Sequence, residues 1–130
     1  MANINHTLGV NHRSASSTLI DNVEIQTNYT SDSVYTRDFR NFVLYLNIDS
    51  TGSATDILFD VEFSDDNVTF YKLTDWWYGD LRYTDTQTAA GVLESMGYYI
   101  QGRYVRLTTT VTGGDGTNYF TVTAKMEFYN

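Results

Sequence analysis

The chain contains no cysteine among its 130 residues, and this absence removes several classes of site at once. Disulfide frameworks, thiolate zinc sites, iron–sulfur clusters and cysteine nucleophiles are all excluded. Cations are also scarce, because eight Lys and Arg stand against sixteen Asp and Glu and leave a net charge of -8. Such a charge repels phosphate backbones and anionic membranes, so we expect neither nucleic acid nor a membrane as a partner.

Long apolar runs and proline are missing as well. Residues Met1 to Val10 carry neither the positive region nor the apolar core of a secretion signal, so we expect a soluble protein made in a cytoplasm. Aromatic residues are abundant at 15%, eleven of them Tyr, and there are nineteen Thr but only two Lys. This composition favours β structure, and the length suits one domain with one core.

Four runs alternate apolar and polar residues with the period of a strand that buries one face. Their predicted inward rows are Phe42, Leu44, Leu46 and Ile48; Ile57, Phe59, Val61 and Phe63; Val105, Leu107, Thr109 and Val111; and Phe120, Val122, Ala124, Met126 and Phe128. Weaker strands are predicted over 23–27, 68–73 and 76–83.

Turn residues separate these runs at Asp49–Ser53, Ser64–Asn67 and Thr112–Asn118, and we predict that each joins two strands as a hairpin. Only Thr88 to Met96 suits a short helix, of one turn at most, because Gly91 and Gly97 limit its length. The predicted fold is therefore all-β, an antiparallel β-sandwich or jelly roll.

Residues 1–20 differ from the rest of the chain. They are rich in Asn, Ser and Thr, and their few apolar residues follow no sustained period. Such a segment cannot bury a face of its own, so we predict an extended N-terminal arm over 1–20 that orders against a neighbour, followed by a β-sandwich domain over 21–130.

The residues of acid–base and nucleophilic catalysis do not form a convincing site. His6 and His12 both lie in the arm without a carboxylate at an orienting distance, and we interpret them as solvated side chains. Asp75, Asp80 and Asp85 are interleaved with aromatic residues as in a sugar cleft, but Asp is also the ordinary residue of loops. We expect no enzyme.

Two turns contain oxygen ligands of the kind that calcium prefers. They are Asp65-Asp66-Asn67 and the glycine-flanked Asp115. Neither shows the spaced ligand series of an EF-hand loop, and turns favour the same residues without a metal. Turn formation is the better account, and we expect neither a metal nor a cofactor.

The strongest functional signal is aromatic. In a strand Trp76 and Trp77 point to opposite faces, so one of the two meets solvent, a ligand or a partner. Trp, Tyr and Arg are favoured both at protein interfaces and at sugar-binding surfaces. The candidate interface or ligand residues are Trp76, Trp77, Tyr78, Arg82, Tyr83, Tyr98 and Tyr99.

Three segments resemble parts of a known family. Val61 to Phe70 resembles the strand, Ser-x-Asp-Gly turn and aromatic strand of discoidin-like (coagulation factor 5/8 type C) galactose-binding jelly rolls. Gly102 to Leu107 is similar to that family's Ala-Arg-Tyr-Val-Arg strand, and Ala124 to Phe128 stands where its closing strand carries a Glu. The resemblance covers about residues 57 to 128 and implies a galactose-binding-like sandwich.

The whole chain also resembles tailed-bacteriophage virion proteins, in particular capsid decoration (cement) proteins, which are small, acidic and lysine-poor. This resemblance implies a non-enzymatic virion protein that decorates or cements a capsid after synthesis in the host cytoplasm. Its partners would be the major capsid protein or other virion proteins and further copies of itself, with a trimer favoured. The alternative is a carbohydrate-binding module or receptor-binding tail element, in which Trp76, Trp77, Tyr78 and Arg82 form a stacking platform for a glycan.

Overall fold

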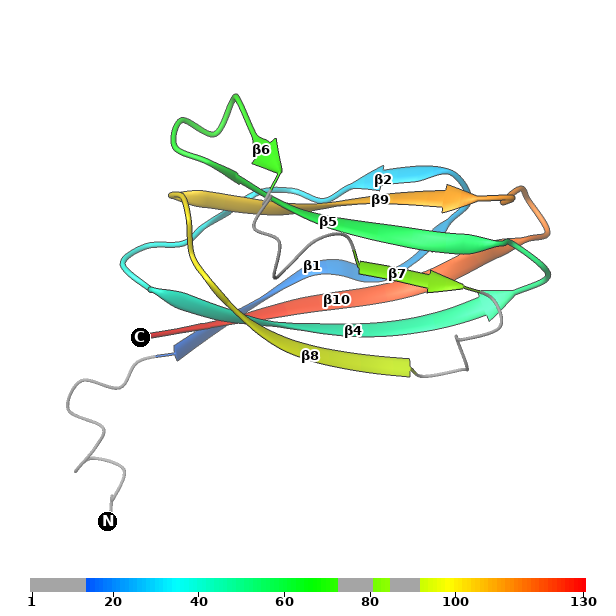
Figure 1. The fold of residues 1–130 in the computed structure, drawn as a ribbon, viewed down its shortest axis with the longest axis horizontal. Helices are drawn as coiled ribbons and strands as arrows, with labels where there is room; N and C mark the ends of the chain where they lie inside the picture. The colour runs from blue at the N-terminus through cyan, green and yellow to red at the C-terminus, as the bar shows by residue number, and fades with distance from the viewer. Residues whose placement is uncertain (1–13, 73–80, 85–91) are drawn as a thin grey trace, which may run out of the picture.

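The computed structural model describes residues 14–72, 81–84 and 92–130, with the backbone alone for 81–84 and 92–98. These residues form two antiparallel β-sheets packed face to face, so the predicted all-β sandwich is confirmed (Figure 1). Among the residues described, no helix is long and apolar enough to cross a membrane.

One sheet has four strands in the order β1-β10-β4-β8. These strands are β1 (Ser14–Ile25), β10 (Tyr119–Tyr129), β4 (Asn41–Thr51) and β8 (Val92–Tyr99). The other sheet has six strands, with the path β2-β9-β5-β6, while β3 also pairs with β9 and β7 also pairs with β5. These strands are β2 (Asn28–Thr30), β3 (Val34–Tyr35), β5 (Asp56–Ser64), β6 (Tyr71–Lys72), β7 (Leu81–Thr84) and β9 (Tyr104–Thr112).

The core lies between the two sheets. Every residue of the four predicted inward rows is buried, which confirms all four strands. Strand β10 lies between β1 and β4, and β9 lies between β5 and the short strands β2 and β3, so β9 and β10 are both central strands. Rings contribute much of the buried volume, since Phe42, Phe59 and Phe120 are fully buried.

The chain crosses from one sheet to the other between most consecutive strands. Strands β4 and β5 lie in different sheets, as do β9 and β10, so the segments Asp49–Ser53 and Thr112–Asn118 are arches over the core. The hairpin prediction is wrong for these two segments and right for Ser64–Asn67, which joins the paired strands β5 and β6. Alternation shows that a strand buries one face, but it does not show whether the next strand pairs with it or faces it.

The predicted N-terminal arm over 1–20 is too long. Residues 14–20 form the first half of β1, which pairs with β10 along its length, and Leu19 and Ile20 are buried. Register shifts between Thr18 and Ile20 and between Ile20 and Val23 interrupt the alternation of apolar residues. These two bulges explain why the sequence shows no period there. Residues 1–13, with His6 and His12, lie outside the described part of the chain.

The predicted helical turn over Thr88 to Met96 is also wrong where the structure describes it. Residues 92–96 belong to β8, whose Met96 and Val92 lie opposite Leu44 and Ile48 of β4. Pairing with a long neighbouring strand therefore overrides the helical preference of single residues in this segment.

Candidate interaction surface

The exposed apolar side chains gather at one end of the sandwich. This loop end consists of the β3–β4 link (36–40), the β5–β6 loop (65–70) and the β8–β9 link (100–103), with the strand ends beside them (Figure 1, left). Among the residues with described side chains, the exposed large hydrophobics are Tyr35 at 54%, Val68 at 80%, Tyr71 at 71% and Tyr99 at 68%. All four lie in or beside these segments. Exposed aromatic side chains at one end make the loop end a candidate interaction surface.

The β5–β6 loop is held rigid by its own polar side chains. Oδ1 of Asp66 accepts hydrogen bonds from the backbone N–H groups of Val68 and Thr69, each at 2.9 Å, and lies 2.9 Å from Oγ of Ser64. The Ser64 hydroxyl in turn accepts a 2.9 Å bond from the N–H of Asn67, which has a φ of 62°. The bonds from Thr69 and Val68, followed by that from Ser64, lower the pKa of the Asp66 carboxyl below its ordinary value.

Links from different strands are tied together beneath this surface. The backbone N–H of Thr36 donates to the carbonyl of Arg103 at 2.7 Å, and the Thr36 hydroxyl lies 2.8 Å from the carbonyl of Gly102. A Cβ atom at Gly102 would stand 3.0 Å from Cβ of Phe63, so only glycine fits here without a shift of the neighbouring strand. The loop end is thus a preorganised surface.

The outward face of the six-stranded sheet continues this surface with aromatic rings and an arginine. Tyr35 and Tyr104 lie opposite each other on β3 and β9, with ring centroids 5.5 Å apart. The guanidinium of Arg106 lies 3.9 Å from the centroid of the Phe70 ring, and its Nε donates to Oε1 of Glu62 at 2.7 Å. The stacked and ion-paired Arg106 therefore presents a flat, oriented group, as hot spots of protein interfaces do.

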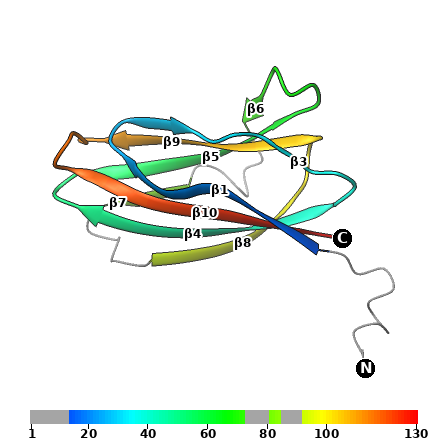
Figure 2. The ribbon, with the colours of Figure 1, turned by 180° about the vertical axis from the view of Figure 1, so that it is seen from behind.

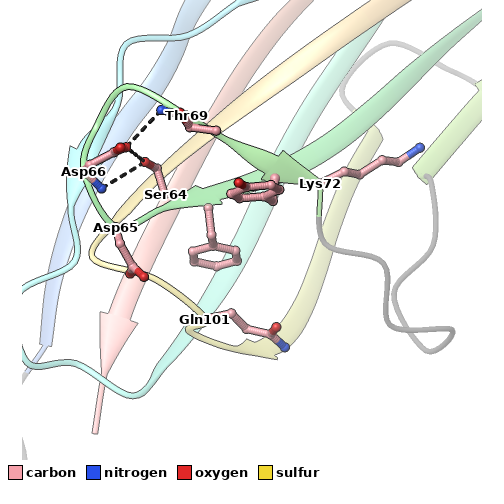
Figure 3. Close-up of a pocket in the computed structure, with 8 residues that line it drawn as sticks. Ser64, Asp65, Asp66, Thr69, Lys72 and Gln101 are labelled. Atoms are coloured by element: carbon pink, nitrogen blue, oxygen red, sulfur yellow. Dashed lines mark hydrogen bonds between the residues drawn. The ribbon is translucent and has the colours of Figure 1, made fainter.

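A pocket of about 370 Å³ opens beside the β5–β6 loop (Figure 3). Figure 3 shows Asp65 and Gln101 on the opposite side of the loop from the hydrogen-bonded cluster of Ser64, Asp66 and Thr69. The Nζ of Lys72 lies 3.4 Å from Oδ1 of Asp60. The pocket is lined by Phe63, Ser64, Asp65, Asp66, Thr69, Tyr71, Lys72 and Gln101.

Solved structures share this architecture, although no family model and no curated protein matches the chain. The VP2 subviral particle of infectious bursal disease virus superimposes with a TM-score of 0.60 at 10% identity, over 92% of this chain and 33% of that one. The PBSX exported protein XepA superimposes with a TM-score of 0.58 at 14% identity, over 88% of this chain and 36% of that one. The fold is a jelly roll. At these identities the likeness concerns the fold alone, and the chain spans about a third of the length of each of these proteins.

The sequence-predicted site residues that the structure describes lie in two different sheets. Arg82 and Tyr83 lie in β7 opposite Leu58 and Ile57, towards the arched end of the six-stranded sheet. Tyr98 and Tyr99 close β8 in the other sheet, at the loop end, opposite Phe42 and Asn41. Of the candidates, Tyr99 is seen exposed at the loop end, while Trp76, Trp77 and Tyr78 lie outside the described residues.

Sequence reasoning missed most of the residues that form the surface. Tyr35 and Tyr104 are far apart in the sequence and meet because β3 pairs with β9. Phe70 and Arg106 are also far apart in the sequence and meet because the β5–β6 loop lies beside β9. The available signal was the polar turn 64–67 followed two residues later by the aromatic pair Phe70 and Tyr71, since polar turns lie at the surface and keep their neighbours close to it.

The two turns that contain possible calcium ligands each have a carboxylate that accepts hydrogen bonds within its own turn. A single oxygen of Asp66 and a single oxygen of Asp115 each accept several hydrogen bonds from their own turn, as the turn interpretation predicts. Within the described ranges no three His, Asp or Glu residues are grouped to hold a metal ion. Asp75, Asp80 and Asp85 lie outside those ranges.

Proposed function

We propose that the protein is a non-enzymatic bacteriophage virion protein that decorates or cements the capsid through contacts with its own copies and with capsid protein. The observation that carries this proposal is the gathering of exposed Tyr and Val side chains on a rigid loop end. The jelly-roll fold, shared with the VP2 subviral particle, is compatible with such a role but does not determine it. The resemblance to discoidin-like jelly rolls remains a prediction.

The proposed mechanism is burial of this aromatic surface in a symmetric homo-oligomer, a trimer being favoured, and against the capsid. The net charge of -8 suits an outer surface of a particle, away from packaged nucleic acid. Trp76, Trp77, Tyr78 and Tyr98 remain predicted contact residues. Arg82 and Tyr83, which lie towards the arched end, would contribute to a separate contact.

Solution mass and capsid attachment test the proposal. Replacing Tyr71 and Tyr99 with Ser should weaken self-association or attachment about tenfold or more per hot-spot residue, the scale of such residues in other interfaces. The matched control is Tyr119→Ser, which lies at the arched end opposite Thr51 and should leave both measurements unchanged. Equal affinities for the wild type and the double variant would contradict the proposal.

The second candidate function is carbohydrate binding, in a binding module or receptor-binding tail element. The observation that favours it is the Tyr35–Tyr104 pair, because neighbouring tyrosine rings on a sheet face can stack on a sugar ring. A titration with saccharides that shifts the ring resonances of Tyr35 and Tyr104, with capsid attachment unchanged in the Tyr71 and Tyr99 variants, would favour this function over the first.

A further inference from the structure

The pocket beside the β5–β6 loop combines apolar walls with an excess of negative charge. Phe63 and Tyr71 supply the apolar lining, and Tyr71 is largely exposed. Asp65 has no hydrogen-bond or ion-pair partner among the described residues, and Asp66 beside it is a hydrogen-bonded carboxylate. Lys72 also lines the pocket, and its ammonium lies 3.4 Å from Asp60, so the lining has two carboxylates for one cation that is shared with a third carboxylate. The pocket suits an occupant that is partly apolar and partly basic.

One segment of this chain has that chemistry. Residues 1–13 contain none of the sixteen acidic residues, and they include Arg13 and both histidines. In an extended conformation side chains two residues apart share a face, so Leu8 and Val10 would form an apolar pair flanked by His6 and His12. The remainder of the chain, with seven of the eight Lys and Arg and all sixteen acids, has a net charge of -9 (7 − 16).

The same segment leaves the sandwich at the loop end. Ser14 lies opposite Tyr129, Tyr129 lies opposite Asn41, and Asn41 lies opposite Tyr99, so one row of paired residues runs across the four-stranded sheet at this end. Figure 2 shows the start of β1 beside the carboxyl end of the chain. Strands β1 and β8 are opposite edges of the sheet, and the pocket lies on the β8 side, next to Gln101. Thirteen extended residues reach up to about 40 Å, which is enough to enter an adjoining molecule.

We propose that residues 6–13 of one copy bind in the β5–β6 pocket of a second copy. The proposal rests on the self-association proposed above and names the segment and the receiving site. Leu8 and Val10 lie against Phe63 and Tyr71, and the basic side chains lie near Asp65 and Asp66. A contact that joins one face of a copy to a different face of the next closes into a ring when the rotation allows it, as in a trimer.

The absence of cysteine makes disulfide trapping a clean test. Full-length Leu8→Cys and Tyr71→Cys variants are mixed under mild oxidation, and the yield of the mixed covalent dimer is measured by mass spectrometry. The matched control pairs Leu8→Cys with Gly116→Cys, an exposed position in the arch at the opposite end with open space around it. We expect at least a fivefold excess of the first dimer over the control dimer.

A charge substitution tests whether the carboxylates of the pocket attract the basic segment. Adding Asp65→Asn to the Tyr71→Cys copy should lower the yield several-fold, whereas Asp49→Asn, at the opposite end of β4, should not change it. Equal yields with the two cysteine positions would overturn the proposal, as would an intramolecular disulfide in the Leu8→Cys/Tyr71→Cys double variant without dimers. Sedimentation of the unmodified chain separates the failure of this proposal from the failure of the proposed self-association. If the chain is an oligomer but trapping is not selective, only the docking site is wrong. If trapping is selective but the chain sediments as a monomer, only the stable oligomer is wrong.

Discussion

At the scale of single residues, two aspartates each organise a turn through one carboxylate oxygen. Oδ1 of Asp66 does so in the β5–β6 loop, and Oδ1 of Asp115 accepts bonds from the N–H groups of Thr117 and Asn118 at 2.8 and 2.9 Å. In Asp115 the backbone and hydroxyl bonds of Thr117, followed by the side chain of Asn118, lower the pKa of the carboxyl. Both carboxylates therefore stabilise the folded state in their ionised form.

These lowered pKa values predict how stability depends on pH. A carboxyl whose pKa is lower in the folded state than its ordinary 3.8 contributes fully above that value and loses the contribution as the pH falls through the folded pKa. We expect Asp66→Ala to lower the melting temperature at neutral pH, and the difference from the wild type to shrink as the pH falls below 3.8. Melts at several pH values measure this. Asp65→Ala is the control, and an equal effect of the two substitutions would contradict the prediction.

At the scale of single elements, the two arches connect one sheet to the other and so make the fold a sandwich. The β4–β5 and β9–β10 arches contact each other, with the N–H of Ser53 donating to Oδ1 of Asn118 at 2.7 Å. Gly52 has a φ of 78°, and a Cβ atom there would collide with Asn118 and with the carbonyl of Thr117. Turn residues in the sequence predict where the chain bends, but not that the bend leads into the opposite sheet.

A pair of glycine substitutions measures what this contact contributes. Gly52→Ala should reduce the free energy of unfolding by about 1–3 kcal/mol, the usual cost of a strained backbone, because the alanine must adopt a left-handed conformation as well as displace the second arch. Gly116→Ala is the matched control, since nothing lies near the added carbon. Urea titrations give both values. A Gly52→Ala variant as stable as the wild type would show that the arches are loosely held.

Strand β1 shows where sequence patterns fail at this scale. Its alternation is interrupted at Leu19 and again beside Asn22, which has a φ of 54° and donates its N–H to Oγ1 of Thr123 at 3.1 Å. Each bulge shifts the side-chain period by one residue, so a fixed period of two cannot detect the strand.

Two truncations locate the true start of the sandwich. Removing residues 1–13 should leave a cooperative melt, because β1 begins at Ser14. Removing residues 1–20 should abolish that melt or lower its midpoint strongly, since it takes Leu19 and Ile20 from the core and exposes half of the β10 edge. Calorimetry compares the two. Equal melts would restore the boundary that the sequence predicted.

The topology of the whole molecule explains which features the sequence could reveal. The inward rows are local patterns, and they predicted the core and the fold class. The loop-end surface is non-local, because it joins Tyr35, Val68, Tyr71 and Tyr99 through strand pairings and crossovers that no short pattern encodes. Exposure of an aromatic ring is likewise decided by what the rest of the chain covers, so residue type alone identifies only candidates.

The same topology makes a kinetic prediction. Pairing of β1 with β10 and of β5 with β9 joins segments that are distant in the sequence, and such folds form in milliseconds to seconds. The chain contains no Pro, so no phase of tens of seconds from prolyl isomerisation should follow. Stopped-flow refolding after short and long times in denaturant should give identical traces. A slow phase that grows with time in denaturant would contradict this expectation.

The antiparallel pairing of β1 with β10 also determines how the molecule carries load. Ser14 lies opposite Tyr129, so a force pulling on the two ends acts on the open end of the β-ladder and separates one residue pair at a time. A force that enters at the loop end and leaves at the arches runs along the strands of both sheets and must shear many hydrogen bonds together (Figure 1). The molecule is therefore mechanically soft between Ser14 and Tyr129 and stiff along its length.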